Sequence, residues 1–225
     1  MASGSMYLIG LTGNIATGKS SVARILQELG AHVVDADRLA HWLMEPGTEV
    51  WQQVVDAFGE EMIGSGDRID RSRLGALVFF DPGALRRLEE IVHPAVLAET
   101  ERILTGIERT HDAEEGGLQQ GEVVRGPVAV VEAIKLIESG LADRCDSVWV
   151  LTCERDLQVQ RMMENRGLTR AEALLRIDAQ PLQGQKVELA DVVIENYGSR
   201  EDLRERVERE WERLHALLPR SDYMT

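Results

Sequence analysis

Residues 10–21 read GLTGNIATGKSS, and inside this stretch Gly13–Ser20 match the pattern of a glycine, four variable residues and Gly-Lys-Ser. An apolar run at 7–12 precedes the loop, and residues 19–29 place apolar side chains at helical spacing. Strand, glycine loop and helix in this order are the context of a phosphate-binding loop, which favours that interpretation over a chance match in a glycine turn. The loop N–H groups and the positive end of the helix would face the phosphates.

Each position of the loop has an expected role. Lys19 would reach the β- and γ-phosphates of a nucleotide, and the Ser20 hydroxyl would hold Mg²⁺. The residues expected to bind a nucleotide triphosphate and its Mg²⁺ are Gly13, Asn14, Ile15, Ala16, Thr17, Gly18, Lys19, Ser20 and Ser21.

The rest of the chain alternates short apolar strands with amphipathic helices. Strands are expected at 32–37, 128–133, 147–152 and 191–196, and the run VAVVEA at 128–133 suits a strand buried on both faces. Helices are expected at 38–58 with a break at Pro46-Gly47, and at 71–79, 81–93, 94–108, 154–165, 169–180 and 199–218, with an exposed loop at 110–122. This pattern predicts a doubly wound α/β fold with a parallel sheet.

Composition and net charge limit the classes of binding partner and the cellular compartment that we expect. The 225 residues carry 25 Lys and Arg against 39 Asp and Glu, a formal charge of −14, which disfavours a nucleic-acid partner. No apolar run is long enough to span a bilayer, and the start of the chain lacks the basic region of a secretory signal. The two cysteines, Cys145 and Cys153, imply no disulfide framework, so a cytoplasmic protein is expected.

Three acidic residues lie at the carboxyl ends of expected strands and are candidates for the chemistry. Glu132, at the end of VAVVE, is the best candidate to orient a metal ion, although an ordinary carboxylate at a strand end is the alternative. Asp35 and Asp37 end the second strand, where ligands bind in such sheets. Asp37 could accept the proton of an attacking hydroxyl, whereas one of the pair could instead cap the helix that starts at Arg38. We expect catalysis from Asp37 and capping or support from Asp35.

Arg161, Arg166 and Arg170 surround a turn between two expected helices. Mobile arginines can neutralise the charge that spreads over a transferring phosphoryl group, and closure of such a segment excludes water. Surface ion pairs are the alternative, and we prefer the catalytic interpretation for Arg161 and Arg166.

The order of several motifs separates this chain from other proteins with the same loop. No N-K-x-D element of a GTPase is present. The succession GLTGNIATGKSSVA, VVDADRLAH, EPG, IDRSRLGALVF, EEIVHPAV, RMMENRGLTRAEALLRIDAQ and ADVVIENYGS closely resembles the dephospho-coenzyme A kinase family over residues 7–210.

This resemblance implies an ATP- and Mg²⁺-dependent transfer of the γ-phosphate to the 3′-hydroxyl of dephospho-CoA, with Asp37 as the base. It also implies a nucleotide-binding core at 6–37, 123–153 and 186–225, a helical substrate domain at 38–122 and a lid at 154–185. By the same resemblance, Asn196 lies where the adenine end of ATP is expected. Arg71 and His93 match substrate-side motifs, together with Asp35 and Asp37.

The chain departs from the family pattern after the strand at 128–132. Glu132 stands where the family usually has Asp, and Ile134 and Lys135 stand where Pro and Leu are usual. Two other functions share the loop: another kinase of nucleosides or nucleoside monophosphates, and a nucleotide-binding switch that has no acceptor.

Overall fold

The computed structural model describes residues 6–115 and 126–218. Contacts divide the chain into two units, residues 1–34 with 104–225, and residues 35–103. The first unit carries nearly all of the sheet together with the glycine loop, and the second is helical.

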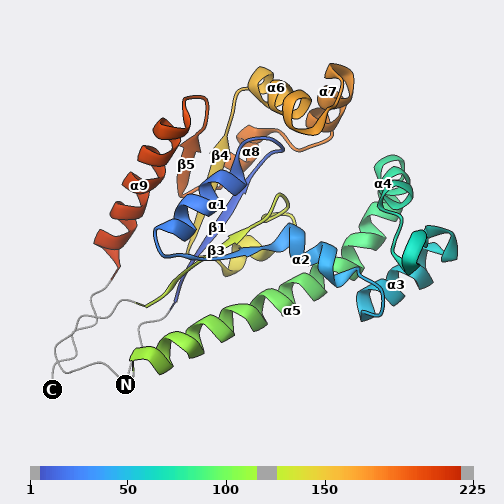
Figure 1. The fold of residues 1–225 in the computed structure, drawn as a ribbon, viewed down its shortest axis with the longest axis horizontal. Helices are drawn as coiled ribbons and strands as arrows, with labels where there is room; N and C mark the ends of the chain where they lie inside the picture. The colour runs from blue at the N-terminus through green and yellow to red at the C-terminus, as the bar shows by residue number, and fades with distance from the viewer. Residues whose placement is uncertain (1–5, 116–125, 219–225) are drawn as a thin grey trace. The chain divides into compact units, whose positions relative to one another are not determined.

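A five-stranded parallel sheet in the order β2-β3-β1-β4-β5 forms the frame of the fold (Figure 1). The strands are β1 Tyr7–Gly13, β2 His32–Asp35, β3 Val128–Glu132, β4 Ser147–Thr152 and β5 Val192–Glu195. All five residues of β3 are buried, as expected for a strand covered on both faces. The predicted α/β fold is confirmed.

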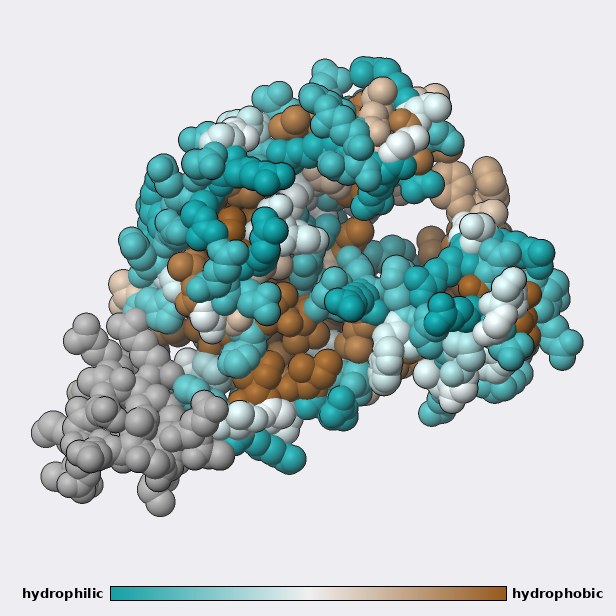
Figure 2. Space-filling model, in the orientation of Figure 1, coloured by the Kyte–Doolittle hydropathy of each residue, from teal (hydrophilic) through white to brown (hydrophobic). Residues whose placement is uncertain are grey.

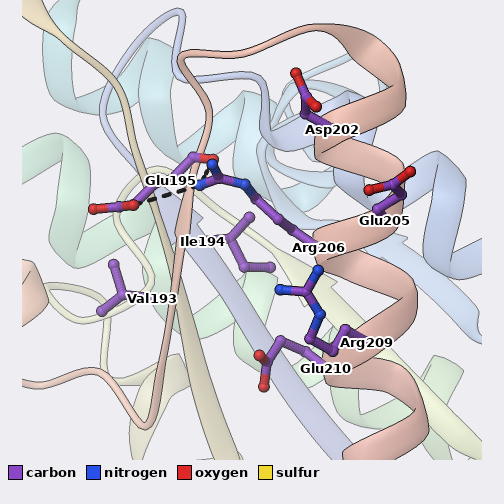
Figure 3. Close-up of a pocket in the computed structure, with 8 residues that line it drawn as sticks. All are labelled: Val193, Ile194, Glu195, Asp202, Glu205, Arg206, Arg209 and Glu210. Atoms are coloured by element: carbon purple, nitrogen blue, oxygen red, sulfur yellow. Dashed lines mark hydrogen bonds and ion pairs between the residues drawn. The ribbon is translucent and has the colours of Figure 1, made fainter.

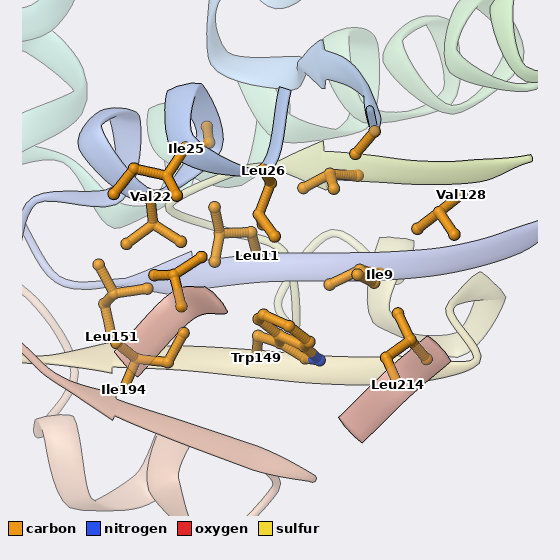
Figure 4. Packing of buried hydrophobic residues seen from close by; sticks show 14 of the residues in the cluster. Ile9, Leu11, Val22, Ile25, Leu26, Val128, Trp149, Leu151, Ile194 and Leu214 are labelled. Atoms are coloured by element: carbon orange, nitrogen blue, oxygen red, sulfur yellow. The ribbon is translucent and has the colours of Figure 1, made fainter. Parts of the chain in front are cut away.

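One face of the sheet packs against α1, Lys19–Glu28, and α9, Arg200–Leu217 (Figure 4). Because side chains alternate along a strand, Ile9 and Leu11 point to the same face. The cluster that they join includes Val22, Leu26, Val128, Val130, Trp149, Leu151, Ile194, Leu203 and Val207. Burial of each aliphatic side chain contributes about 1.5–3 kcal/mol. This core fixes α1, and therefore the loop that leads into it.

The other face of β1 is covered by the segment that follows β3, which includes η3, Leu141–Arg144. A Cβ atom at Gly10 would lie 2.7 Å from Leu136 Cδ2 and 2.8 Å from Cys145 Sγ. Only glycine allows this close approach. The segment after β3 is therefore packed directly on the strand that leads into the glycine loop.

The second unit contains α2, Ala36–Leu43, α3, Glu49–Phe58, the short η1, Glu60–Met62, and η2, Ser65–Asp67, then α4, Arg71–Phe80, and the start of α5, Pro82–Glu115. Polar side chains cap these helices: Thr48 accepts from the Trp51 N–H, and Asp70 accepts from the N–H groups of Ser72 and Arg73. The predicted break at Pro46-Gly47 lies between α2 and α3.

Helix α5 corrects two expectations. The sequence predicted separate helices at 81–93 and 94–108 followed by an exposed loop at 110–122, but a single helix runs from Pro82 to Glu115 with Pro94 inside it. Val92, Val96, Thr100 and Leu104 form a buried stripe at four-residue spacing. Packing of this stripe offsets the roughly 3 kcal/mol that an internal proline costs. Residues 116–122 of the predicted loop lie outside the described residues.

The C-terminal part of the first unit contains α6, Arg155–Arg166, α7, Arg170–Asp178, and α8, Gln183–Val187. The first two agree with prediction, and α8 was not predicted. Ser199 caps α9 as expected, in a capping box with Asp202. Figure 2 shows a mainly hydrophilic surface on the face in view, and within the described residues no helix is long and apolar enough to cross a bilayer.

Candidate functional site

The glycine loop begins where three parallel strands end. Leu11 of β1 pairs with Glu132, the last residue of β3, and Gly13 pairs with Leu151 near the end of β4. Ligands bind at the carboxyl ends of the strands in open α/β sheets. The register alone therefore places Glu132 beside the loop.

Two glycines give the loop its shape. At Gly13 a Cβ atom would lie 2.6 Å from the Leu151 carbonyl oxygen, so β4 leaves room for hydrogen only. Gly18 has a φ of +101° and precedes α1 without a side-chain cap. The first turn of α1 therefore keeps N–H groups available for an anion.

Lys19 and Ser20 follow the loop on the first turn of α1. The Lys19 side chain is buried, and its Nζ donates to the Gly13 carbonyl at 3.1 Å, across the mouth of the loop. Ser20 Oγ donates to Glu132 Oε1 at 3.1 Å. The structure thus brings together the cation, hydroxyl and carboxylate that the sequence predicted for phosphate and metal binding.

Arg161 and Asn196 clamp the other side of the loop. Arg161 Nη1 donates to the carbonyls of Ala16 and Thr17, both at 3.2 Å, and Nη2 donates to Asn196 Oδ1 at 3.3 Å. Asn196 Nδ2 donates to the Thr17 carbonyl at 2.7 Å. The Arg161 guanidinium, expected to be mobile, is engaged here in fixing the backbone of the loop.

Cys153 contacts the same guanidinium. Arg161 Nη1 lies 3.4 Å from Cys153 Sγ. Burial raises the pKa of the Cys153 thiol, and the nearby Arg161 charge only partly opposes this rise. The thiol is therefore neutral at physiological pH and serves as a weak acceptor.

Residues 180–183, to which the sequence assigned no contact with the loop, form hydrogen bonds to the loop and to Cys153. Gln180 Oε1 accepts from the Ile15 N–H at 2.7 Å, and the Pro181 carbonyl accepts from Asn14 Nδ2 at 3.0 Å. Gln183 Oε1 accepts from the Cys153 N–H at 3.2 Å. These contacts join residues up to 167 positions apart, so no local pattern could have indicated them.

Helices α6 and α7 form a small core of their own. Val159 and Met162 of α6 pack with Ala173 and Ile177 of α7, and Ile15 and Ala16 of the loop pack against this cluster. The apolar residues at two variable positions of the loop are thereby explained.

A pocket of about 700 Å³ opens beside the loop. Ser20, Arg161, Arg166 and Asn196 line it, together with residues from α1 and the start of α9, among them Arg24, Arg200 and Arg204. The lining holds five arginines and one glutamate and is therefore cationic, although the whole chain is acidic. Its volume is in the range of ordinary small-ligand sites.

A second hollow of about 420 Å³ lies between β5 and α9 and away from the loop residues (Figure 3). Arg206 Nη1 donates to the Glu195 carbonyl at 3.0 Å and pairs with the Glu195 carboxylate at 3.4 Å. Four carboxylates and two arginines line this hollow, so it lacks the cationic lining of the pocket beside the loop.

Four predicted residues belong to the unit at 35–103. Strand β2 ends at Asp35, whose carboxylate caps α2 by accepting from the Arg38 N–H at 2.8 Å, so the expected capping role is confirmed. Asp37 does not end the strand as predicted but lies in the first turn of α2, where it is half-buried. Arg71 pairs with Glu45 at 3.4 Å, and His93 lies inside α5 rather than at a helix junction.

Comparison with known proteins identifies the family. The family model described as dephospho-CoA kinase matches residues 7–202. Dephospho-CoA kinase of Geobacter sulfurreducens is 44% identical over 206 residues, covering 92% of this chain and 98% of that protein. The enzyme of Thermobifida fusca is 38% identical over 213 residues, covering 95% and 98%.

Solved structures agree with this result. A protein from Thermus thermophilus has a TM-score of 0.74 at 33% identity, covering 95% of this chain and 98% of that one. Dephospho-CoA kinase from Campylobacter jejuni, at a TM-score of 0.63 and 24% identity, covers 93% and 98% and supports the fold. Shikimate kinase from Acinetobacter baumannii, at 0.52 and 16%, shares the fold alone. The chain belongs to the dephospho-CoA kinase family.

Proposed function

We propose that this protein transfers the γ-phosphate of ATP to the 3′-hydroxyl of the dephospho-CoA ribose, giving coenzyme A and ADP. The observation that carries the proposal is the loop with Lys19 and the Ser20–Glu132 pair, in a chain whose family match spans residues 7–202. In the transfer the bond between the γ-phosphorus and the bridging oxygen breaks, and a bond from the 3′-oxygen to that phosphorus forms.

The donor binds along the loop and in the cationic pocket. Backbone N–H groups at the end of the loop and the start of α1 face the phosphates, and Lys19 exchanges its contact with the Gly13 carbonyl for the β- and γ-phosphates. Asn196 lies in the same pocket and is assigned to the adenine end of ATP. Arg166 is exposed at the pocket lining and is free to turn toward the transferring phosphate.

Ser20 and Glu132 would hold Mg²⁺. Both offer hard oxygen ligands, and their contact at 3.1 Å places them side by side. Among the described residues no three histidine, cysteine or carboxylate side chains converge on one point. A site with two protein ligands suits Mg²⁺, which keeps several waters and binds substrate phosphates. When bound, the ion would neutralise charge on the phosphates.

The acceptor is assigned to the helical unit. Asp37 accepts the proton of the 3′-hydroxyl as that oxygen attacks, and Asp35, Arg71 and His93 bind the acceptor. These roles follow from the family resemblance, and the domain assignment 38–122 for the acceptor and 154–185 for the lid has the same basis. Asp35 combines this role with its cap of α2, which fixes the backbone before Asp37.

The test is phosphate transfer from γ-labelled ATP to dephospho-CoA by the purified protein. We expect labelled coenzyme A, with adenosine, AMP and shikimate as acceptors at least a hundredfold less efficient by kcat/KM. Faster transfer to a nucleoside or nucleotide would replace the proposal with that kinase. ATP hydrolysis that dephospho-CoA does not alter would indicate a nucleotide switch.

A further inference from the structure

Lys186 on α8 is a buried lysine outside the residues that the family resemblance assigns. Lys186 is only 3% exposed, and a lysine is almost never buried this deeply unless its ammonium group has a partner. Its Nζ donates to the Ile134 carbonyl and pairs with the Glu138 carboxylate at 3.3 Å. Both partners belong to the segment that follows β3.

The Ile134 carbonyl receives a second donor. Thr12 Oγ1, fully buried at the end of β1, donates to the same oxygen at 3.2 Å. One carbonyl thus ties together the strand that leads into the glycine loop, the turn after β3, and α8. Thr12 immediately precedes Gly13, and Ile134 is two residues after Glu132.

The Ile134 carbonyl and its two donors lie at the point where the regular pairing of β1 with β3 stops. The Ala133 N–H still donates to the Leu11 carbonyl at 3.1 Å, and beyond it the backbone leaves β3. The Glu132 carboxylate is joined to this backbone by two methylene groups, so a shift of the backbone would displace it relative to Ser20. Lys186 and Thr12 hold that backbone from two sides.

We propose that Lys186 is a positioning residue, which through the Ile134 carbonyl keeps the Glu132 carboxylate against Ser20 and thereby sets the affinity for Mg²⁺. The inference rests on the proposed metal role of Glu132. The competing explanation is that Lys186 only neutralises Glu138, whose side chain is 34% exposed. The first explanation assigns the role of the Lys186 ammonium group to its contact with the Ile134 carbonyl, and the second assigns it to the ion pair with Glu138.

Lys186→Met removes the ammonium but keeps the length of the side chain, and Thr12 still satisfies the Ile134 carbonyl, so we expect it to fold. Glu138→Gln is the matched control, because it removes the ion pair and leaves the Lys186 contact with Ile134. Thr12→Val removes the other donor without changing side-chain shape. Glu132→Gln reports the metal role itself.

The measurement is the ratio of ATP dissociation constants without and with Mg²⁺, by calorimetry, with the melting temperature beside it. Outer-shell changes typically weaken metal binding about tenfold or more. We expect Lys186→Met and Glu132→Gln to lower the ratio about tenfold, with metal-free ATP affinity within about twofold of the parent. Thr12→Val should lower it less, and Glu138→Gln should leave it unchanged. The Mg²⁺ concentration for half-maximal turnover should rise in the same order.

Three outcomes overturn the inference. One is an unchanged ratio in Lys186→Met, or in Thr12→Val if the former does not fold. Another is an equal fall in Glu138→Gln, which would assign the effect to the ion pair. An unchanged ratio in Glu132→Gln would remove the metal role on which the inference rests. None of these outcomes depends on the acceptor, so transfer to dephospho-CoA is judged separately.

Discussion

Gly18→Ala and Gly30→Ala form a matched pair, because both glycines flank α1 with nearly the same positive φ. Their φ values are +101° and +105°. A Cβ atom at Gly30 would meet nothing within 4 Å, whereas at Gly18 it would fall on the side-chain amide nitrogen of Asn196. The two variants therefore share the backbone strain, and only Gly18→Ala disturbs Asn196 in the nucleotide site.

The expected magnitudes follow from those contacts. A left-handed alanine costs about 1–2 kcal/mol, which both variants bear. Gly18→Ala also turns the Asn196 amide away from the Thr17 carbonyl and loses a hydrogen bond of 2.7 Å. That carbonyl still accepts from Arg161 at 3.2 Å, so the additional loss is about 1–2 kcal/mol and not the full penalty of an unsatisfied group. For a chain of this size each kcal/mol lowers the melting temperature by about 2–4 °C.

Thermal unfolding and ATP titration of the two variants test this reasoning. Gly30→Ala should melt about 2–8 °C lower with ATP affinity within about twofold of the parent. Gly18→Ala should melt a further 2–8 °C lower, at about 2–4 °C per kcal/mol. It should bind ATP about 5- to 30-fold more weakly, since each 1.4 kcal/mol corresponds to tenfold. Equal losses of stability and of affinity in the two variants would refute the role assigned to the Asn196–Thr17 contact.

Three further predictions concern single residues. Asp37→Asn should retain ATP affinity by calorimetry while kcat falls about 10²–10⁴-fold, and near-normal turnover would remove Asp37 from the mechanism. Burial, with a smaller effect of the Asp146 charge, raises the pKa of Cys145 to about 12. Iodoacetamide at pH 8 should therefore label this thiol only when the protein unfolds. Rapid labelling of the native protein would contradict the packing of Cys145 against Gly10. Ser199→Ala breaks the capping box of α9 and should lower stability by about 1 kcal/mol in thermal melts, and an unchanged melting temperature would contradict this role of the cap.

Local sequence patterns were sufficient to predict the strands of the sheet and the glycine loop. The glycines, Lys19 and Ser20 follow from a motif whose spacing is itself the geometry, and the run at 128–132 could only be a buried strand. Glu132 followed from its place at a strand end, since the carboxyl ends of parallel strands meet at one edge. The contact with Ser20 agrees with that reasoning.

Features that depend on distant packing could not be predicted. The continuity of α5 through Pro94 depends on a stripe of buried side chains that outweighs a local helix breaker. The contacts of Gln180 and Pro181 with the loop depend on residues more than 160 positions away. Arg161 was found by its position in a motif, but its contacts with loop carbonyls were not, because a charge pattern does not say which oxygen receives the charge.

These distant contacts would restrict the motion of the lid that we propose at 154–185. Cys153 and Gln183, at its two ends, are joined through a hydrogen bond of 3.2 Å, and Gln180 and Pro181 are bound to the loop. Between these ends, α6 and α7 share a hydrophobic core and an ion pair, Arg155–Asp178, at 2.6 Å. The pair would therefore move as one body about fixed ends, and Arg161 would have to leave the Ala16 and Thr17 carbonyls for any large opening. In the proposed function the nucleotide binds at that loop, so an opening that frees Arg161 would also loosen the loop and would couple lid motion to the affinity for ATP.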